Sequence, residues 1–226
     1  MDSHSQLPLG FKALSPDYTR AGFILSETNQ NALSIADKWI ASQERRLAVC
    51  GPDGSGKTHL ATIIAKDIGG EAQWMAGEAI TDPAPGADVV IDDVQKATNP
   101  EQLLSVVSGC QAAGVRLILA GRGQPVDWAQ GLKDLATRLE AMPRLNLGEP
   151  DEELLRVVIQ KLFVDLQLRV DPTVSAYAAP RLPRTFAAAQ AFVAAADAAA
   201  TEKKSPITKV LAGNVINNLS EGGFRS

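Results

Sequence analysis

The sequence predicts an α/β fold in which helices sandwich a parallel sheet and a small C-terminal helical unit follows. Short runs that are apolar throughout alternate with stretches of helical composition, which is typical of strands buried on both faces. A glycine-rich loop joins one of these runs to the next helix, and the chain beyond Pro150 carries helical patterns alone. Its 226 residues exceed one typical domain and are few for two large ones.

The first half of the chain supplies the elements of the sheet. Apolar runs of strand length occupy residues 46–50, 88–94 and 115–120. Helical patterns occupy residues 31–40, 59–68 and 100–113. Because strands and helices alternate along the chain, we expect the strands to pair in parallel.

The last third of the chain is predicted to form a group of helices. Helical composition marks residues 152–166, 171–179, 185–201 and 206–219. The alanine run within the third of these segments favours a tightly packed helix, because alanine is the strongest helix former. We therefore expect an N-terminal arm (residues 1–20), an α/β domain (residues 21–149) and a helical lid domain (residues 150–226).

The composition excludes several classes of protein. A formal net charge of −4 argues against a large nonspecific DNA-binding surface, so any DNA role is expected to run through a protein partner. No stretch approaches the length of a membrane span and no secretory leader is evident, so we expect a cytoplasmic protein. Cys50 and Cys110 stand in apolar surroundings without metal-ligand spacing, and we expect buried, reduced thiols.

The strongest motif is the loop after the first predicted strand, which matches the pattern G-x-x-x-x-G-K-T. Its glycines let backbone N–H groups point at phosphate oxygens, and the next helix presents its positive N-terminal end. Lys57 is expected to reach the β- and γ-phosphates and Thr58 to ligate Mg²⁺. The alternative is a glycine-rich turn with an incidental lysine. The predicted binding residues for ADP or ATP here are Gly51, Pro52, Asp53, Gly54, Ser55, Gly56, Lys57, Thr58 and His59.

Two neighbouring carboxylates end the second apolar run. Asp92 follows residues 89–91, where a Mg²⁺ ion held by Thr58 and the phosphates requires a carboxylate from a neighbouring strand. Asp93 is then placed to orient or deprotonate the attacking water. The simpler interpretation is an Asp-Asp turn between a strand and a loop. We expect Asp92 to be a metal ligand and Asp93 a catalytic residue.

Further segments carry a resemblance to a known family. They are residues 51–60, 91–95, 134–139 and 181–186. Together they resemble the AAA+ domain of the DnaA family of replication initiators, and more closely the Hda-like regulators within it. The resemblance implies an AAA+ P-loop NTPase with a C-terminal helical lid. The chain ends at Ser226 without room for the DNA-binding domain of the initiators, which favours the regulators and implies no direct sequence-specific DNA binding.

The resemblance also implies two protein partners. Residues 6–11 are similar to the short peptide by which Hda-like regulators dock on the DNA polymerase sliding clamp. Gln6 would supply hydrogen bonds, with Leu9 and Phe11 as apolar anchors and Leu7 beside them. Without the resemblance, a loose terminus or a contact with the domain's own surface is the favoured interpretation of these residues. The second implied partner is ATP-bound DnaA.

Arg138 stands where the resemblance implies an arginine finger. Such a residue reaches across a subunit contact to the γ-phosphate held by a partner's loop. The fixed planar charge of arginine suits this task, because it stabilises phosphate oxygens as their charge redistributes. The alternative is a surface arginine that pairs with Asp134 or Glu140. The first interpretation makes Arg138 a catalytic residue for DnaA-bound ATP.

Other residues are candidates for sensing this chain's own nucleotide. Arg184 resembles the family's sensor arginine on the lid, which contacts the phosphates and sets the angle between lid and core. Arg181 competes for that role, and both also fit solvated arginines at a helix start. Asn29 is a weaker candidate for the adenine pocket, with helix capping as the alternative.

The sequence departs from the AAA+ pattern after the third apolar run. AAA+ domains usually place a polar side chain there that helps to position the attacking water. Here the positions are Ala120, Gly121 and Arg122, although a one-residue shift of the strand end is an alternative explanation. We therefore expect this chain's own hydrolysis to be slow.

These expectations combine into a regulator that binds the sliding clamp and stimulates hydrolysis of ATP bound to DnaA, limiting re-initiation of replication. Two alternatives stay open: an ATP-driven loader or adaptor of a replication protein such as a helicase, and a module that holds ADP without hydrolysing nucleotide. Robust hydrolysis that is lost in Lys57→Ala would favour the loader. A homo-oligomer, head-to-tail or two-fold, is compatible with each.

Overall fold

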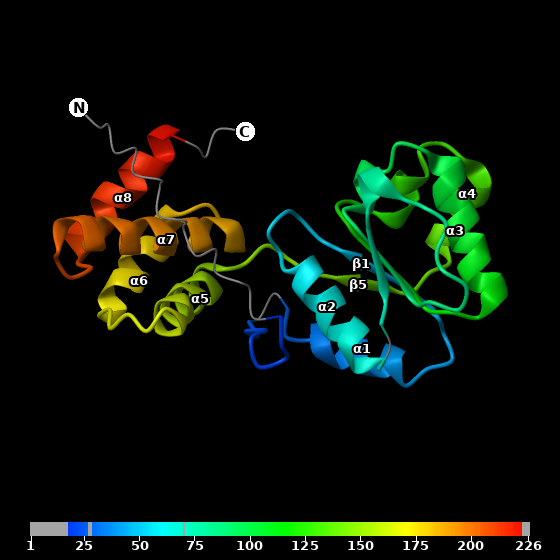
Figure 1. Ribbon diagram of the computed structural model, residues 1–226, viewed down its shortest axis with the longest axis horizontal. Helices are drawn as coiled ribbons and strands as arrows, with labels where there is room; N and C mark the ends of the chain where they lie inside the picture. The colour runs from blue at the N-terminus through cyan, green and yellow to red at the C-terminus, as the bar shows by residue number, and fades with distance from the viewer. Residues whose placement is uncertain (1–17, 27–28, 70, 223–226) are drawn as a thin grey trace, which may run out of the picture.

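A parallel sheet forms the centre of the α/β region of the molecule. The computed structural model describes residues 18–26, 29–69 and 71–222. Its strands are β1 (Arg46–Cys50), β2 (Gln73–Ala76), β3 (Val89–Asp92), β4 (Leu117–Gly121) and β5 (Arg144–Asn146). They lie in the order β2-β3-β4-β1-β5 and all run parallel. Figure 1 shows β1 beside the edge strand β5. The loops after β1, β3 and β4 therefore leave the same edge of the sheet.

Helices cover both faces of this sheet. One face packs on α1 (Ala32–Ile40) and α2 (Lys57–Asp67), and the other on α3 (Pro100–Ala113) and α4 (Lys133–Glu140). Short 3-10 turns lie at η1 (Gly77–Ala79), η2 (Val94–Lys96) and η3 (Pro125–Ala129). Side chains alternate along a strand, so Leu47 and Val49 of β1 belong to the first core and Ala48 and Cys50 to the second. Burial on both faces explains why the strand sequences are apolar throughout.

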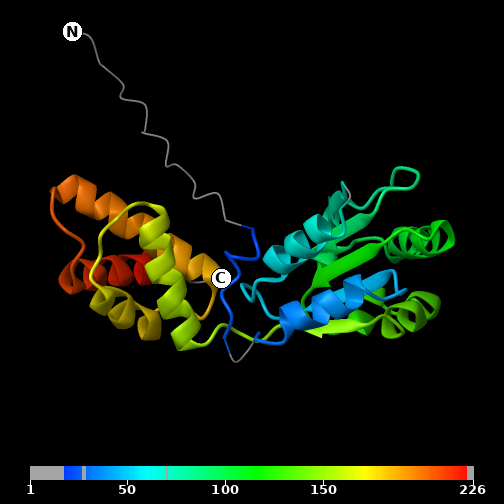
Figure 2. The ribbon, with the colours of Figure 1, turned by 90° about the horizontal axis from the view of Figure 1, so that it is seen from below.

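The C-terminal helices form a unit with its own hydrophobic core, which we call the lid. It consists of α5 (Glu152–Asp165), α6 (Pro172–Ala178), the 3-10 turn η4 (Ala179–Arg181), α7 (Phe186–Lys203) and α8 (Lys209–Gly222). Phe163 and Phe192 meet edge to face inside it, with 6.2 Å between their ring centroids. Figure 2 shows the lid beside the α/β region, with residues 18–26 running between them. Among the residues that the structure describes, each helix is too short or too polar to cross a bilayer.

Polar caps determine where several helices begin and end. Asn99 before α3 and Asp151 before α5 each accept a hydrogen bond from a first-turn backbone N–H, at 3.0 and 2.7 Å. The Thr185 hydroxyl accepts one from the N–H of Ala188 at 3.1 Å and so begins α7. Gly114 follows α3 with a φ of 66°, the left-handed conformation that commonly stops a helix. These caps set where α3, α5 and α7 begin and where α3 ends.

The structure confirms the predicted α/β fold with its parallel sheet and C-terminal helices. β1 and α3 occupy the predicted residues, and the other predicted elements shift by a few residues at their ends. β3 ends at Asp92, earlier than predicted, because Asp93 turns the chain with a φ of 52°. The sequence patterns do not predict β2 and β5, because edge strands of four and three residues are too short to form an apolar run.

Truncation of the lid core is expected to be costly. Phe192→Ala should lower the free energy of unfolding by about 3–5 kcal/mol, because the ring is fully buried. Val164→Ala on α5 is the matched control, since its side chain is 61% exposed and the change should stay within about 0.5 kcal/mol. Urea denaturation followed by circular dichroism measures both. Similar losses in the two variants would contradict a lid core centred on Phe192.

Candidate functional site

Residues 51–58, which we call the phosphate loop, connect β1 to α2. Gly54 and Gly56 have φ values of 68° and 93°, a conformation that strains any residue with a side chain. Gly56 caps α2, so the backbone N–H groups of the first helical turn lie at the end of the loop. Backbone donors at a helix N-terminus are suited to phosphate oxygens. The loop therefore has the backbone geometry that phosphate binding requires.

Lys57 is buried at the start of α2. Its Nζ atom donates a hydrogen bond to the carbonyl oxygen of Pro52 at 2.7 Å, and the residue is only 6% exposed. Burial lowers the pKa of its ammonium group, and the nearby carboxylates of Asp53, Asp93 and Asp92 oppose that shift. A cation with so little water around it would be stabilised by a phosphate. These surroundings are compatible with the phosphate-binding role of Lys57, which stays a prediction.

Thr58 and Asp92 meet at the carboxyl edge of the sheet. The Thr58 hydroxyl donates to Oδ2 of Asp92 at 2.7 Å, and Oδ1 of Asp92 accepts from the N–H of Asp93 at 2.9 Å. Hydroxyl and carboxylate oxygens are the hard ligands that Mg²⁺ prefers, so this donor set fits the metal. Ser55 adds a buried hydroxyl with no hydrogen-bond partner among the described residues. The pair Thr58 and Asp92 could hold Mg²⁺, which would neutralise phosphate charge when bound.

Asp93 lies beside this pair, but its carboxylate is already engaged. It accepts hydrogen bonds from Nζ of Lys96 at 2.7 Å and from the side chain of Gln95 at 3.2 Å. The bond from Lys96 lowers the pKa of Asp93, so the carboxylate is ionised at neutral pH and weakly basic. Because this ion pair is exposed and costs little to break, Lys96 weakens Asp93 as a general base without blocking it. Sequence patterns gave no signal for Lys96, because it stands on a short turn after the strand.

A cavity of about 340 Å³ opens between the phosphate loop, residues 18–24 and the lid. Its walls combine the lysine and backbone donors of the loop with aromatic and aliphatic side chains. His59 stands between two rings, its centroid 5.3 Å from that of Tyr18 and 5.2 Å from that of Phe23, both edge to face. Apolar walls beside a phosphate-binding loop suit an adenine nucleotide. The apolar and aromatic lining residues include Tyr18, Phe23, Ile24, Val158, Leu162 and Phe186.

Arg20 connects residues 18–24, which line one side of the cavity, to the α/β region. Its guanidinium forms ion pairs with Asp37 of α1 and with Asp67 of α2, the second at 2.7 Å. Hydrogen bonds to these two carboxylates raise the pKa of Arg20. Lys66 holds the same segment by donating to the carbonyl oxygen of Tyr18 at 3.0 Å. Sequence patterns cannot reveal Arg20, because its partners stand 17 and 47 residues away.

The two lid arginines lie in different settings. Arg184 is exposed and immediately precedes Thr185. A Cβ atom added at Gly54 would lie 2.5 Å from that of Thr185, so Arg184 stands one residue from the contact between loop and lid. Arg181 instead donates to the carbonyl oxygen of Tyr177 at 2.8 Å, with its guanidinium 4.0 Å from the centroid of the Tyr177 ring. Neither arginine is among the described residues that line the cavity beside the phosphate loop, so the choice between them stays a prediction.

The remaining candidates form two groups. Asn29 does not cap α1 through its side chain. It accepts from the N–H of Ser26 at 2.7 Å and donates to the carbonyl oxygen of Ile24 at 3.0 Å, so it shapes the turn that carries a cavity-lining residue. The predicted clamp-binding residues Gln6, Leu7, Leu9 and Phe11 lie outside the described residues.

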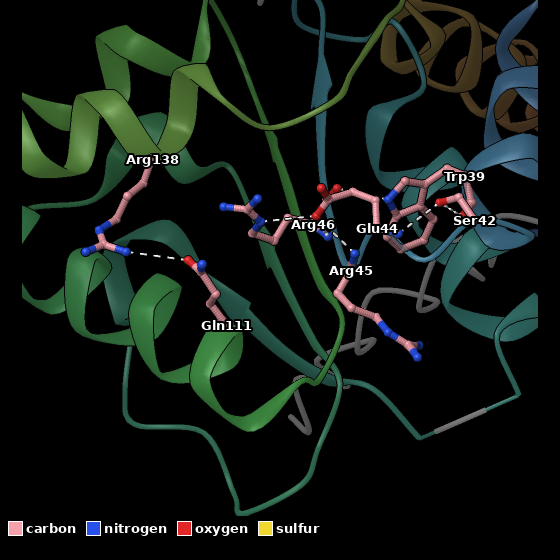
Figure 3. A network of polar contacts seen from close by, with 7 residues as sticks. All are labelled: Trp39, Ser42, Glu44, Arg45, Arg46, Gln111 and Arg138. Carbon is pink, nitrogen blue, oxygen red and sulfur yellow. Dashed lines mark hydrogen bonds and ion pairs between the residues drawn. The ribbon is translucent and has the colours of Figure 1, made fainter.

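Arg138 lies at the end of the sheet opposite the phosphate loop. Its Nε atom pairs with Asp134 at 3.1 Å. Its guanidinium donates to Gln111 near the end of α3 at 3.4 Å, as Figure 3 shows. Gln111 lines a shallow groove with Arg45 and Arg46, at the start of β1. The phosphate loop follows the other end of β1, and this five-residue strand is roughly 13–16 Å long. Arg138 is remote from this chain's own phosphate loop.

The residue that follows β4 is charged. The strand continues through Gly121, where an added Cβ would lie 2.7 Å from Cγ1 of Val94 and 2.8 Å from Oε1 of Gln95, so packing excludes a side chain. Arg122 is the first residue beyond the strand, and its guanidinium pairs with Asp53 of the phosphate loop at 2.9 Å. An arginine bound to the phosphate loop thus stands where the AAA+ pattern leads us to expect another polar side chain.

Comparison with known proteins bears on the fold. No protein-family model and no curated protein sequence matches this chain. Domain III of the replication initiation protein DnaA of Thermotoga maritima matches with a TM-score of 0.77 and 16% identity, over 90% of this chain and 97% of that domain. The RuvB Holliday junction branch migration motor of the same organism matches with a TM-score of 0.73 and 18% identity, over 90% of this chain and 72% of that one. This chain has the AAA+ P-loop NTPase fold.

Metal dependence tests the assignment of Asp92. Asp92→Asn is expected to weaken nucleotide binding about ten-fold with Mg²⁺ present and to change it little in EDTA, because the amide retains an acceptor for Thr58 but is a poorer metal ligand. Titration with a fluorescent adenine nucleotide measures both affinities. Asp88→Asn, at the other end of β3, makes the same chemical change away from the loop and should have no effect. Equal weakening in Mg²⁺ and EDTA would contradict the assignment.

Proposed function

We propose that this chain is an Hda-like regulator of replication initiation. It binds ADP or ATP with Mg²⁺, docks on the DNA polymerase sliding clamp through residues 6–11, and stimulates hydrolysis of ATP bound to DnaA. The AAA+ fold that this chain shares with DnaA domain III supports a replication-related ATPase. The clamp contact and the action on DnaA-bound ATP are our proposal. The observation that carries it is the position of Arg138 relative to the phosphate loop.

In this proposal the chain's own nucleotide joins the α/β region to the lid. Lys57 and the backbone N–H groups of the phosphate loop hold the phosphates, while Thr58 and Asp92 hold Mg²⁺. Arg184 contacts the phosphates from the lid, next to the loop contact made by Thr185. The cavity supports this role, because the phosphate loop and the lid both line it. Bound nucleotide would therefore fix the lid against the α/β region.

Arg138 acts on a nucleotide held by the partner. It is separated from its own phosphate loop by the length of β1, so a catalytic role for it requires a second molecule. Its side chain is 34% exposed, and its ion pair with Asp134 joins residues four apart on one helix. Such exposed pairs contribute only about 0.3–0.5 kcal/mol, so a phosphate can displace the carboxylate. A head-to-tail contact with DnaA would place Arg138 at the γ-phosphate of DnaA-bound ATP.

Slow turnover of this chain's own nucleotide fits the same proposal. The hydrogen bond from Lys96 lowers the pKa of Asp93 and so weakens it as a base, and Arg122 stands in place of the polar side chain that usually helps to position water. Both features disfavour activation of a water molecule at this chain's own site. A regulator that lends an arginine to another ATPase does not need fast hydrolysis itself.

The proposal predicts a large and specific effect of Arg138. Arg138→Ala should reduce stimulation of DnaA-bound ATP hydrolysis at least about 100-fold, since arginine fingers accelerate such reactions by about 10³–10⁵-fold. The assay measures phosphate release from ATP-loaded DnaA with DNA-loaded clamp present. Arg156→Ala is the matched control, because Arg156 also pairs with a carboxylate on its own helix, Glu153. Equal stimulation by all three proteins, or none by the intact chain, would refute the proposal.

A loader or remodelling ATPase is the second candidate. The Thr58 and Asp92 pair favours it, because the metal donors needed for turnover are in place. This candidate requires rapid hydrolysis by the chain alone that Lys57→Ala abolishes, with little effect of Arg138→Ala on DnaA. The same assay without DnaA therefore separates the two functions.

A further inference from the structure

An ion pair connects the phosphate loop to the strand beside it. The guanidinium of Arg122 lies 2.9 Å from Oδ2 of Asp53. Asp53 is the third residue of the phosphate loop, and Arg122 directly follows β4. β1 and β4 are neighbours whose last residues, Cys50 and Gly121, are aligned. The two side chains therefore emerge next to each other at the carboxyl edge of the sheet.

The backbone of Arg122 is held while its side chain stays accessible. Its N–H donates to Oε1 of Gln95 at 2.9 Å, and its carbonyl oxygen accepts from the indole N–H of Trp128, which is buried. Close packing around Gly121 fixes the preceding residue. The side chains of Arg122 and Asp53 are nevertheless 56% and 64% exposed. The guanidinium can thus change partners without movement of the backbone.

Asp53 lies at the phosphate end of the cavity, and Arg122 contacts it there. Asp53 lines the cavity together with Lys57, which the proposed function assigns to the β- and γ-phosphates. After burial, which lowers the pKa of Lys57, the charge of Asp53 has the largest influence on it, and Arg122 acts in the opposite direction. Groups that influence the Lys57 ammonium through space also influence a phosphate bound to it. Asp53 repels such a phosphate and Arg122 attracts it.

The opposing charges of Asp53 and Arg122 are expected to affect ATP more than ADP, because ATP has a terminal phosphate that ADP lacks. ATP carries one more anionic phosphate than ADP, at the end where Lys57 and Thr58 are expected to bind. A carboxylate beside that phosphate disfavours ATP unless its charge is balanced. Exposed ion pairs contribute little to stability, so Arg122 can leave Asp53 when a stronger partner arrives. The planar fork of arginine donors suits phosphate oxygens.

We propose that the Asp53–Arg122 ion pair sets the preference of this site between ADP and ATP. Arg122 bonds to Asp53 when the diphosphate is bound and moves to the terminal phosphate when the triphosphate is bound. Asp53 opposes that exchange by competing for the guanidinium and by repelling the terminal phosphate. The proposal rests on nucleotide binding at the phosphate loop and names the residues that distinguish its two ligands.

Binding constants for two nucleotides test the exchange. Affinities of the full chain for ADP and for a non-hydrolysable ATP analogue, both with Mg²⁺, are measured by isothermal titration calorimetry. Arg122→Ala should weaken the ATP analogue about ten-fold relative to ADP, because a charge-assisted hydrogen bond is lost and Asp53 stays uncompensated. Asp53→Asn should strengthen the ATP analogue several-fold relative to ADP, because Arg122 is released. In the double variant the ratio of the two affinities should return toward that of the unaltered chain.

Matched controls and the contrary outcomes complete the design. Glu44→Gln and Arg45→Ala make the same changes of charge at the other end of β1 and should leave the ratio unchanged. If Arg122→Ala and Asp53→Asn also leave the ratio unchanged while the chain binds both nucleotides, this inference is wrong and the proposed binding site stands. If the unaltered chain binds neither nucleotide, the binding site itself is wrong. The two failures are therefore distinguishable.

Discussion

Close contact between the phosphate loop and the lid organises the candidate site. A side chain at Gly54 would overlap Thr185, which caps α7, and the N–H of Phe186 donates to the carbonyl oxygen of Gly54 at 3.4 Å. The α/β region and the lid have separate hydrophobic cores. Around the cavity they meet through this backbone contact and through residues 18–24. A ligand in the cavity would contact both the α/β region and the lid, and its binding energy could set the relative orientation of the two units.

Because all its strands are parallel, the sheet has two chemically different ends. At the carboxyl edge, the loops after β1, β3 and β4 bring together Lys57, Asp92 and Arg122. At the other end, Arg138 and Gln111 lie near the start of β1. A residue at one end cannot contact a ligand that is bound at the other end. A reaction that requires groups from both ends therefore requires two molecules. This separation is the physical basis for proposing action in trans.

Sequence patterns could predict features that are contiguous in the chain. The phosphate loop, the buried strands and Asp92 at a strand end all belong to short local patterns, and the structure places Asp92 beside Thr58. The patterns could not reveal contacts between distant segments, such as the ion pairs of Arg20 or the bond from Arg122 to Asp53, 69 residues apart. The short edge strands were missed because their pairing depends on neighbouring strands rather than on their own composition.

Photo-crosslinking would test most directly whether Arg138 acts on a partner's nucleotide. DnaA is loaded with an ATP analogue that carries a photoreactive group on its γ-phosphate, mixed with this chain and DNA-loaded clamp, and irradiated. Mass spectrometry then locates the label. We predict label within α4 (Lys133–Glu140), the helix that carries Arg138. Label confined to the phosphate loop, or its absence from this chain, would contradict action in trans.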